Sequence, residues 1–207
     1  ISRGGLAGAY RDAGRIDEAI DLFERTLADS ERVLGDDHPD TLISRGGLAG
    51  AYRDAGRIDE AIDLFERTLA DSERVLGDDH PDTLISRGGL AGAYRDAGRI
   101  DDAIDLHERN LADRERVLGD DHPDTLTSRN DLAGAYQSAG RLKEAIDLFE
   151  QNLAEALRVL GPDHPDTKTF RNSLAAAYRA VGRSEDAEAL LDPPSDPDDT
   201  DTEAPTC

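Results

Sequence analysis

The chain has 207 residues, of which 24 are Lys or Arg and 46 are Asp or Glu, so its formal net charge is -22. This charge argues against a nucleic acid partner, because contacts to a phosphate backbone need an excess of basic side chains. No apolar stretch approaches the roughly 20 residues that cross a bilayer, so we expect no membrane association. The only cysteine, Cys207, cannot form an internal disulfide, which agrees with an expected cytoplasmic location.

A repeat of 42 residues organises the sequence. Residues 1–42 and 43–84 are identical, and residues 85–126 differ from them only at Asp102, His107, Asn110 and Arg114. A more diverged fourth copy occupies residues 127–168, and residues 169–192 begin a truncated fifth. All five tyrosines fall at the same place in a copy, so we expect them to serve the scaffold. Units of this size stack on one another, because a single unit cannot bury its apolar faces.

Each copy predicts two helices. In the second copy, apolar residues at three- and four-residue steps or their multiples mark the first helix, namely Leu42, Leu48, Ala49 and Tyr52. Gly56 ends this helix, and the apolar stripe of a second helix of about 19 residues follows from Ile58 and ends at Gly77. In the link to the next copy, we expect Asp79 to cap the following helix and Pro81 to lie in its first turn.

These landmarks resemble those of the tetratricopeptide repeat family, in the 42-residue variety of kinesin light chains and many bacterial proteins. The small, aromatic and glycine positions of the family correspond here to Leu48, Ala49, Tyr52, Gly56, Ala61 and Phe65. The link LGDDHPDTL at residues 76–84 is close to the signature of that variety. The resemblance covers residues 1–192. It implies an all-α, right-handed solenoid of antiparallel helix hairpins with about five repeats.

The two ends of the chain differ from the repeats. Ile1 corresponds to Ile43, which lies inside the first predicted helix of a copy, so we expect the chain to be a fragment of a longer protein. Residues 193–207 contain five acidic residues and no basic one. That composition is typical of a disordered tail.

Few residues suggest chemistry. The histidines of the links lie beside aspartates and are open to a metal-site or a helix-cap interpretation, of which we favour the cap: His38, His80, His122 and His164. His107 replaces a phenylalanine, and we expect a tolerated substitution at a partly exposed position, with a ligand or a pH-sensitive core residue as alternatives. No phosphate-binding loop or nucleophile elbow is present. We therefore expect no enzyme, no catalytic residue, no metal and no cofactor.

The resemblance implies that the first helix of each repeat lines a concave groove, which binds a protein or peptide. Carried over onto this chain, the leading contacts are Asn130, Gln137, Asn172 and Arg179, followed by Arg53 and Arg95. Most acidic residues fall on the second helix of a copy, whereas the first helix offers Arg45 and Arg53 against Asp54. We favour a solvated acidic face as the explanation of this distribution, with a groove that is less acidic than the rest of the surface as the sharper alternative.

Glycines are concentrated in the first helices of the first three copies. Gly46, Gly47 and Gly50 lie inside one such helix, whereas the fourth copy keeps only Gly134 there. At about 0.8–1 kcal/mol each relative to alanine, three glycines cost roughly 3 kcal/mol per repeat. The N-terminal repeats are therefore predicted to open more readily.

Two alternatives to a free-standing interaction module stay open. The array is also compatible with the C-terminal sensor region of a larger bacterial signalling ATPase. The first repeat has no preceding unit to cover it, so end-to-end self-association into a structural array is the other alternative.

Overall fold

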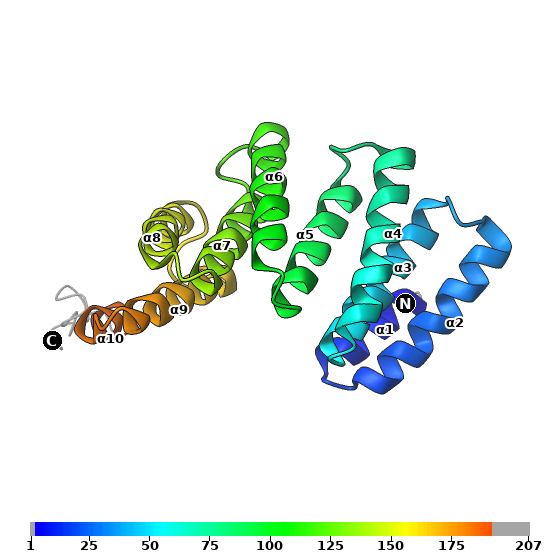
Figure 1. The fold of residues 1–207 in the computed structure, drawn as a ribbon, viewed down its shortest axis with the longest axis horizontal. Coiled ribbons are helices and arrows are strands. Elements are labelled where there is room, and N and C mark those ends of the chain that lie inside the picture. The colour runs from blue at the N-terminus through cyan, green and yellow to red at the C-terminus, as the bar shows by residue number, and fades with distance from the viewer. Residues whose placement is uncertain (1–2, 192–207) are drawn as a thin grey trace, which may run out of the picture.

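The structure, a computed structural model, describes residues 3–191, so the predicted tail at 193–207 lies outside the described residues. Within the described residues, ten helices form five consecutive pairs. The first helices of the pairs are α1 (Arg3–Asp12), α3 (Pro39–Asp54), α5 (Pro81–Asp96), α7 (Pro123–Ser138) and α9 (Pro165–Ala180). The second helices are α2 (Ile16–Leu34), α4 (Ile58–Leu76), α6 (Ile100–Leu118), α8 (Leu142–Val159) and α10 (Ser184–Leu191). Every helix packs against the next, so the predicted all-α stack of about five hairpins is confirmed (Figure 1).

The helix ends follow from the residues in the turns. Gly56, which follows the C-cap residue Ala55 of α3, adopts a φ of 74°, a left-handed conformation that favours glycine. Before α5, the Nδ1 atom of His80 accepts a hydrogen bond from the backbone N–H of Asp82 at 3.2 Å, and Pro81 occupies the first turn. The prediction that Asp79 caps this helix is therefore wrong. Asp79 lies one residue too early, and its carboxylate instead accepts a hydrogen bond from Nη1 of Arg116 at 2.8 Å.

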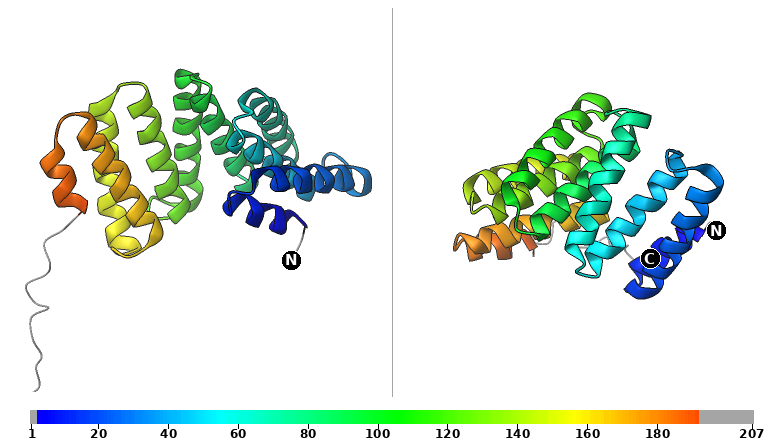
Figure 2. Two further views of the ribbon diagram at one scale, coloured as in Figure 1. Left: turned by 90° about the horizontal axis from the view of Figure 1, so that it is seen from below. Right: turned by 45° about the vertical axis from the view of Figure 1, so that its right-hand side comes forward.

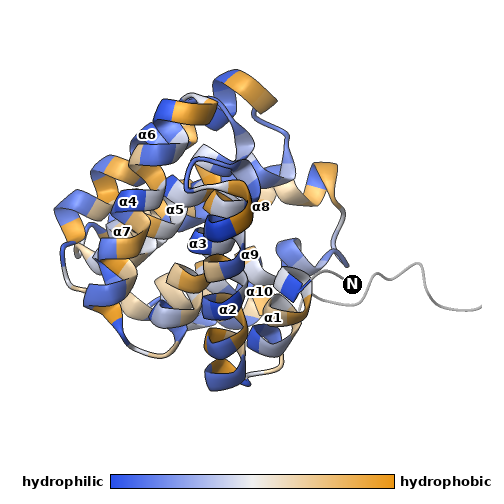
Figure 3. Cartoon of the chain, turned by 90° about the vertical axis from the view of Figure 1, so that its right-hand side faces the viewer, coloured by the Kyte–Doolittle hydropathy of each residue, from blue (hydrophilic) through white to orange (hydrophobic). Residues whose placement is uncertain are grey.

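The core is a series of apolar layers between successive pairs. Between the second and third pairs, Ile62 and Phe65 of α4 are buried with Leu90 and Ala93 of α5. Burying side chains of this size contributes about 1.5–3 kcal/mol each. Figure 3, which looks along the array from the side of α1 and α2, shows hydrophobic and hydrophilic residues mixed on the helices, as expected of elements that are buried on one side only.

The tyrosines connect neighbouring repeats. Tyr94 of α5 donates its hydroxyl hydrogen to Oε1 of Glu66 on α4 at 2.7 Å, and the guanidinium of Arg99 lies 3.8 Å from the ring centroid. The tyrosines of the second, fourth and fifth copies make the same pair of contacts. The predicted scaffold role of these residues is confirmed.

The array curves with its first helices on the inside. Consecutive first helices contact each other, from α1 and α3 through to α7 and α9, whereas within residues 3–191 no two consecutive second helices do. Closer spacing on one side means that this side is the inner side of the curve. Figure 2 shows the resulting arched row of helix pairs.

No described helix, over residues 3–191, combines the length and the apolar character needed to span a membrane.

Candidate functional site

The candidate site is the inner surface formed by α3, α5, α7 and α9, which is the groove that the sequence predicts for a partner. Two arginines bridge neighbouring first helices here. Arg53 of α3 donates from Nε to Oδ2 of Asp96 on α5 at 2.7 Å, and Nε of Arg11 lies 3.6 Å from Oδ2 of Asp54. About a third of the Arg53 side chain stays exposed.

Arg95 of α5 also lies at the inner surface, but its ion pair is longer. Its Nε lies 3.7 Å from Oδ1 of the neighbouring Asp96, whose other oxygen is bound by Arg53. The position of Asp96 is taken by Ser138 in the next copy, so no carboxylate is supplied to Arg95 from there. The predicted contacts Arg53 and Arg95 are thus cations at the inner surface, and Arg53 has the shorter of the two ion pairs with Asp96.

The other predicted contacts lie on α7 and α9. Asn130 and Gln137 are half-buried on α7, while Asn172 and Arg179 are exposed on α9. The Oδ1 atom of Asn130 has no hydrogen-bond partner among residues 3–191. These residues therefore present amide groups and one cation along two neighbouring helices, and their role in binding stays a prediction.

Arg45 does not belong to the groove, contrary to the sequence interpretation. Its side chain is only 2% exposed, and Nη1 donates to Oδ2 of Asp71 on α4 at 2.7 Å. Nη2 lies 3.8 Å from Oε1 of Glu31 on α2. Arg45 is therefore a buried link between two pairs and is not available to a partner.

A cavity of about 200 Å³ lies at the inner surface between α3, α4 and α5. Most of its lining is apolar or glycine, and the full set is Arg11, Leu42, Ile43, Gly46, Gly47, Phe65, Ser72, Asp82, Ile85 and Ser86. Ile43 and Ile85 are 53% and 61% exposed, so the cavity lies beside apolar surface in contact with solvent. Sequence reasoning assigned Phe65 to the scaffold and missed this cavity. The signal for room beside α3 was Gly46, where an added Cβ atom would meet only Cγ2 of Thr68 at 3.9 Å.

His107 occupies the position of Phe65 in the next copy and is 3% exposed. The expectation of a partly exposed position is therefore wrong, because α6 turns this residue into the layer that it shares with the fourth copy. Burial, together with Arg95 and Arg53, lowers the pKa of His107 to about 4. Its imidazole is neutral near pH 7, and Nε2 has no hydrogen-bond partner among the described residues.

Asp131 of α7 adds a second perturbed group to this region. Burial raises the pKa of its carboxyl, while Arg95, Arg114 and Arg53 oppose the shift. Among residues 3–191, the buried apolar cluster at this junction consists of Ile104, Leu111, Leu132 and Ala135, with Ile100, Tyr136 and Leu148 packed against it. Polar groups thus replace part of the apolar layer between the third and fourth pairs.

Within residues 3–191, no three His, Cys, Asp or Glu side chains come together in a way that could hold a metal ion. The histidines of the links act as helix caps through Nδ1. The inner surface therefore offers shape, amides and guanidinium groups, which are the features of a binding surface.

The tetratricopeptide repeat family matches residues 1–73, 46–112, 88–154 and 133–192. A Podosopora anserina structure described as kinesin light chain nearly identical TPR-like repeats is 35% identical, with a TM-score of 0.76, over 92% of this chain and 90% of that one.

Two more distant structures share the fold. BtubC (BKLC) from P. vanneervenii is 23% identical, with a TM-score of 0.73, over 90% of this chain and 74% of that one. A Rap protein complexed with competence and sporulation factor is 14% identical, with a TM-score of 0.78, over 90% of this chain and 50% of that one. No curated protein sequence matches the chain. The family matches together span the five helix pairs, and the chain therefore belongs to the tetratricopeptide repeat family.

Proposed function

We propose that the protein is a non-catalytic interaction module whose inner groove binds an extended segment of a protein partner. The observation that carries this proposal is the cavity of about 200 Å³ between α3, α4 and α5, with its largely apolar lining. One apolar side chain of the partner would enter the cavity, and its burial would supply about 1.5–3 kcal/mol of binding free energy. The Rap protein named above is complexed with a factor, which supports ligand binding by an array of this shape.

Polar contacts would continue along the groove. Asn130, Gln137 and Asn172 offer amides that can hydrogen-bond a peptide backbone. Arg53, Arg95 and Arg179 offer guanidinium groups that can bind acidic or carbonyl groups of the partner. Because the chain carries a net charge of -22, these cations make the groove the less acidic surface. Alanine substitution of each residue, in the assay described next, tests its contribution.

A displayed library of random peptides, selected on the whole chain, provides the test. We expect selected peptides to share one apolar residue. Ile85→Glu places a carboxylate on the exposed edge of the cavity and should weaken binding by about tenfold or more. Val33→Glu is the matched control, because Val33 is 64% exposed and does not line this cavity. Peptides that bind both variants as well as the original chain would contradict the proposal.

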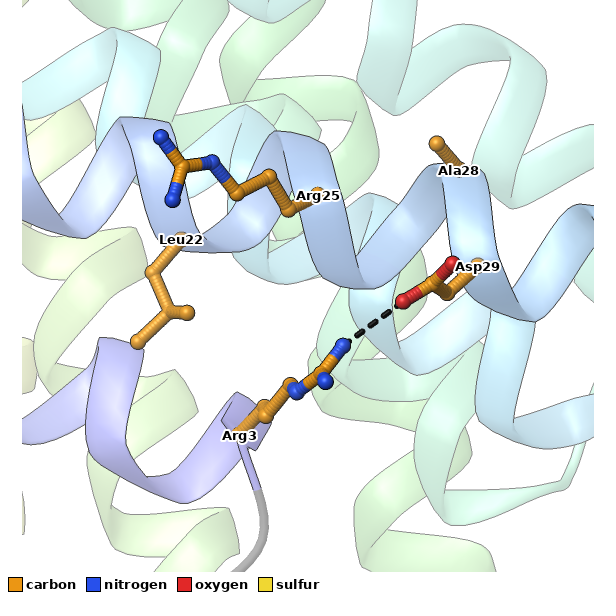
Figure 4. A pocket seen from close by; sticks show the side chains of 5 residues that line it. All are labelled: Arg3, Leu22, Arg25, Ala28 and Asp29. Carbon is orange, nitrogen blue, oxygen red and sulfur yellow. Dashed lines mark hydrogen bonds and ion pairs between the residues drawn. The ribbon is translucent and has the colours of Figure 1, made fainter.

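Self-association is a second candidate, favoured by the exposed face of the first pair. Leu6, Val33 and Leu34 are 40%, 64% and 44% exposed there. Arg3 and Asp29, joined at 2.6 Å, line a cavity of about 470 Å³ between α1 and α2 (Figure 4). A molar mass by light scattering that stays monomeric at all concentrations would remove this candidate. Attachment to an upstream signalling ATPase is tested by the reading frame that precedes Ile1.

A further inference from the structure

Because the repeats are nearly identical, a partner in the groove could bind in several positions, each shifted by one repeat. If every copy carried the same cavity, an apolar side chain could dock at several equivalent places, one repeat apart. The counterpart of the cavity one copy further along would keep the same residue type at seven wall positions, namely Arg53, Leu84, Ile85, Gly88, Gly89, Asp124 and Ser128. Only three wall positions change in type: Phe65 to His107, Ser72 to Arg114 and Ile85 to Thr127.

Arg114 occupies the space that Ser72 leaves open. Its side chain is 9% exposed, and Nη1 donates a hydrogen bond to the backbone oxygen of Asp124 at 2.7 Å. Asp124 is the counterpart of Asp82, which lines the cavity in the preceding copy. The guanidinium therefore reaches from α6 to the first turn of α7, across the position where the second cavity would lie.

Arg114 is held by fewer contacts than Arg87. Among residues 3–191 no carboxylate lies within ion-pair distance of it, and its Nε, like those of Arg45 and Arg87, has no hydrogen-bond partner. Burial lowers the pKa of its guanidinium, while Asp124 and Asp131 oppose the shift from a longer distance. Arg87, by contrast, is buried on two carboxylates. Burying a cation with one backbone partner costs free energy. Stability therefore does not account for Arg114 at this position, and its occupation of the space calls for another explanation.

We propose that Arg114 is a specificity-determining residue that plugs the counterpart cavity one copy further along and thereby removes that docking register, so that the partner's apolar side chain enters the cavity between α3, α4 and α5. This inference rests on the proposed function. The inference can be tested by counting bound probe molecules. A small residue at position 114 should add one binding site, and an arginine at position 72 should remove one.

Equilibrium dialysis with 5-fluoroindole, followed by fluorine NMR, counts the cavities. A dry apolar cavity of about 150 Å³ is enough to bind benzene, so a cavity of this size class suits a small aromatic probe. Relative to the original chain, we expect Arg114→Ser to bind one equivalent more and Ser72→Arg one equivalent fewer, because probe bound at other cavities cancels in the difference. The double variant with both changes should bind as many equivalents as the original chain. Ser184→Arg, at an exposed position that does not line this cavity, should also leave the count unchanged.

The outcomes separate the two proposals. An unchanged count for Arg114→Ser, with one equivalent fewer for Ser72→Arg, overturns the role of Arg114 and leaves the proposed function intact. An unchanged count for both Arg114→Ser and Ser72→Arg overturns both proposals, because the cavity then does not accept an apolar group. If Arg114→Ser does not fold, Arg114→Ala removes the same guanidinium and gives the same count.

Discussion

A Cβ atom on Gly47 would lie 2.5 Å from Cε1 of Phe23, so the ring of α2 packs directly against the backbone of α3. The same arrangement recurs in the next copy, between Phe65 and Gly89. One copy further along, both positions change together, to His107 and Asp131. The first two junctions thus use a large ring against a residue without a side chain, and the third uses two polar residues.

Gly47→Ala should destabilise the array by about 1–3 kcal/mol, because its methyl group collides with the Phe23 ring in a packed layer. Gly46→Ala is the matched control in the same helix. Its nearest neighbour would be Cγ2 of Thr68 at 3.9 Å, an ordinary contact. Gly46→Ala should therefore stabilise by about 0.5–1 kcal/mol through helix propensity. Urea unfolding of both variants measures the difference, and equal effects would contradict the close packing of Phe23.

The pairs, their helix lengths and the scaffold role of the tyrosines could be predicted because the 42-residue repetition displays each spacing several times. Burial of individual arginines could not. Arg45 and Arg53 both lie on α3, and Arg45 is buried because Asp71 and Glu31 approach it from two different second helices. The burial of His107 likewise depends on packing against α7. Such contacts depend on how pairs stack, which the spacing within one copy does not determine.

For the buried Arg87, we predict that removing a carboxylate partner costs more stability than removing the guanidinium itself. Its guanidinium is fully buried and donates to Asp113 at 2.6 Å and to Glu73 at 3.1 Å. Asp113→Ala should cost about 3 kcal/mol, because it leaves a buried cation with one partner fewer. Arg87→Met should cost less than about 1 kcal/mol, since both carboxylates are 25–33% exposed and can be hydrated. Unfolding free energies in urea provide the comparison, and a larger loss for Arg87→Met would refute it.

His107 predicts a loss of stability in mild acid. Its pKa is about 4 in the folded chain, against an ordinary value of 6.5. Between these values the unfolded chain binds the proton more readily, so the free energy of unfolding falls as the pH falls. The contribution of the neutral His107 to the free energy of unfolding is complete above pH 6.5. About 2–3 kcal/mol of this contribution should be lost by pH 4.5. The groups facing His107 include Arg95 and Arg53, which disfavour its protonation.

His107→Gln isolates this effect, because glutamine keeps a polar side chain but does not titrate in this range. Both proteins contain the same carboxylates, including the buried Asp131 at the same junction, so the difference between the two unfolding curves at pH 7 and pH 4.5 reports on the imidazole of His107. The original chain should lose about 2–3 kcal/mol more than the variant between these two pH values. Parallel pH profiles would mean that the imidazole is hydrated in the folded state.

Amide hydrogen exchange should show that the glycine-rich first helices open more readily. Helix α3 contains three interior glycines, whereas α7 contains Gly134 alone, a difference of roughly 2 kcal/mol in helix propensity. Close packing against Phe23 makes use of Gly47 but does not restore the propensity of Gly46 or Gly50. Because stability in a stacked array is a sum over units and their interfaces, α3 should exchange faster than α7. Slower exchange in residues 1–84 than in residues 127–182 would show that packing between identical copies outweighs the glycine penalty.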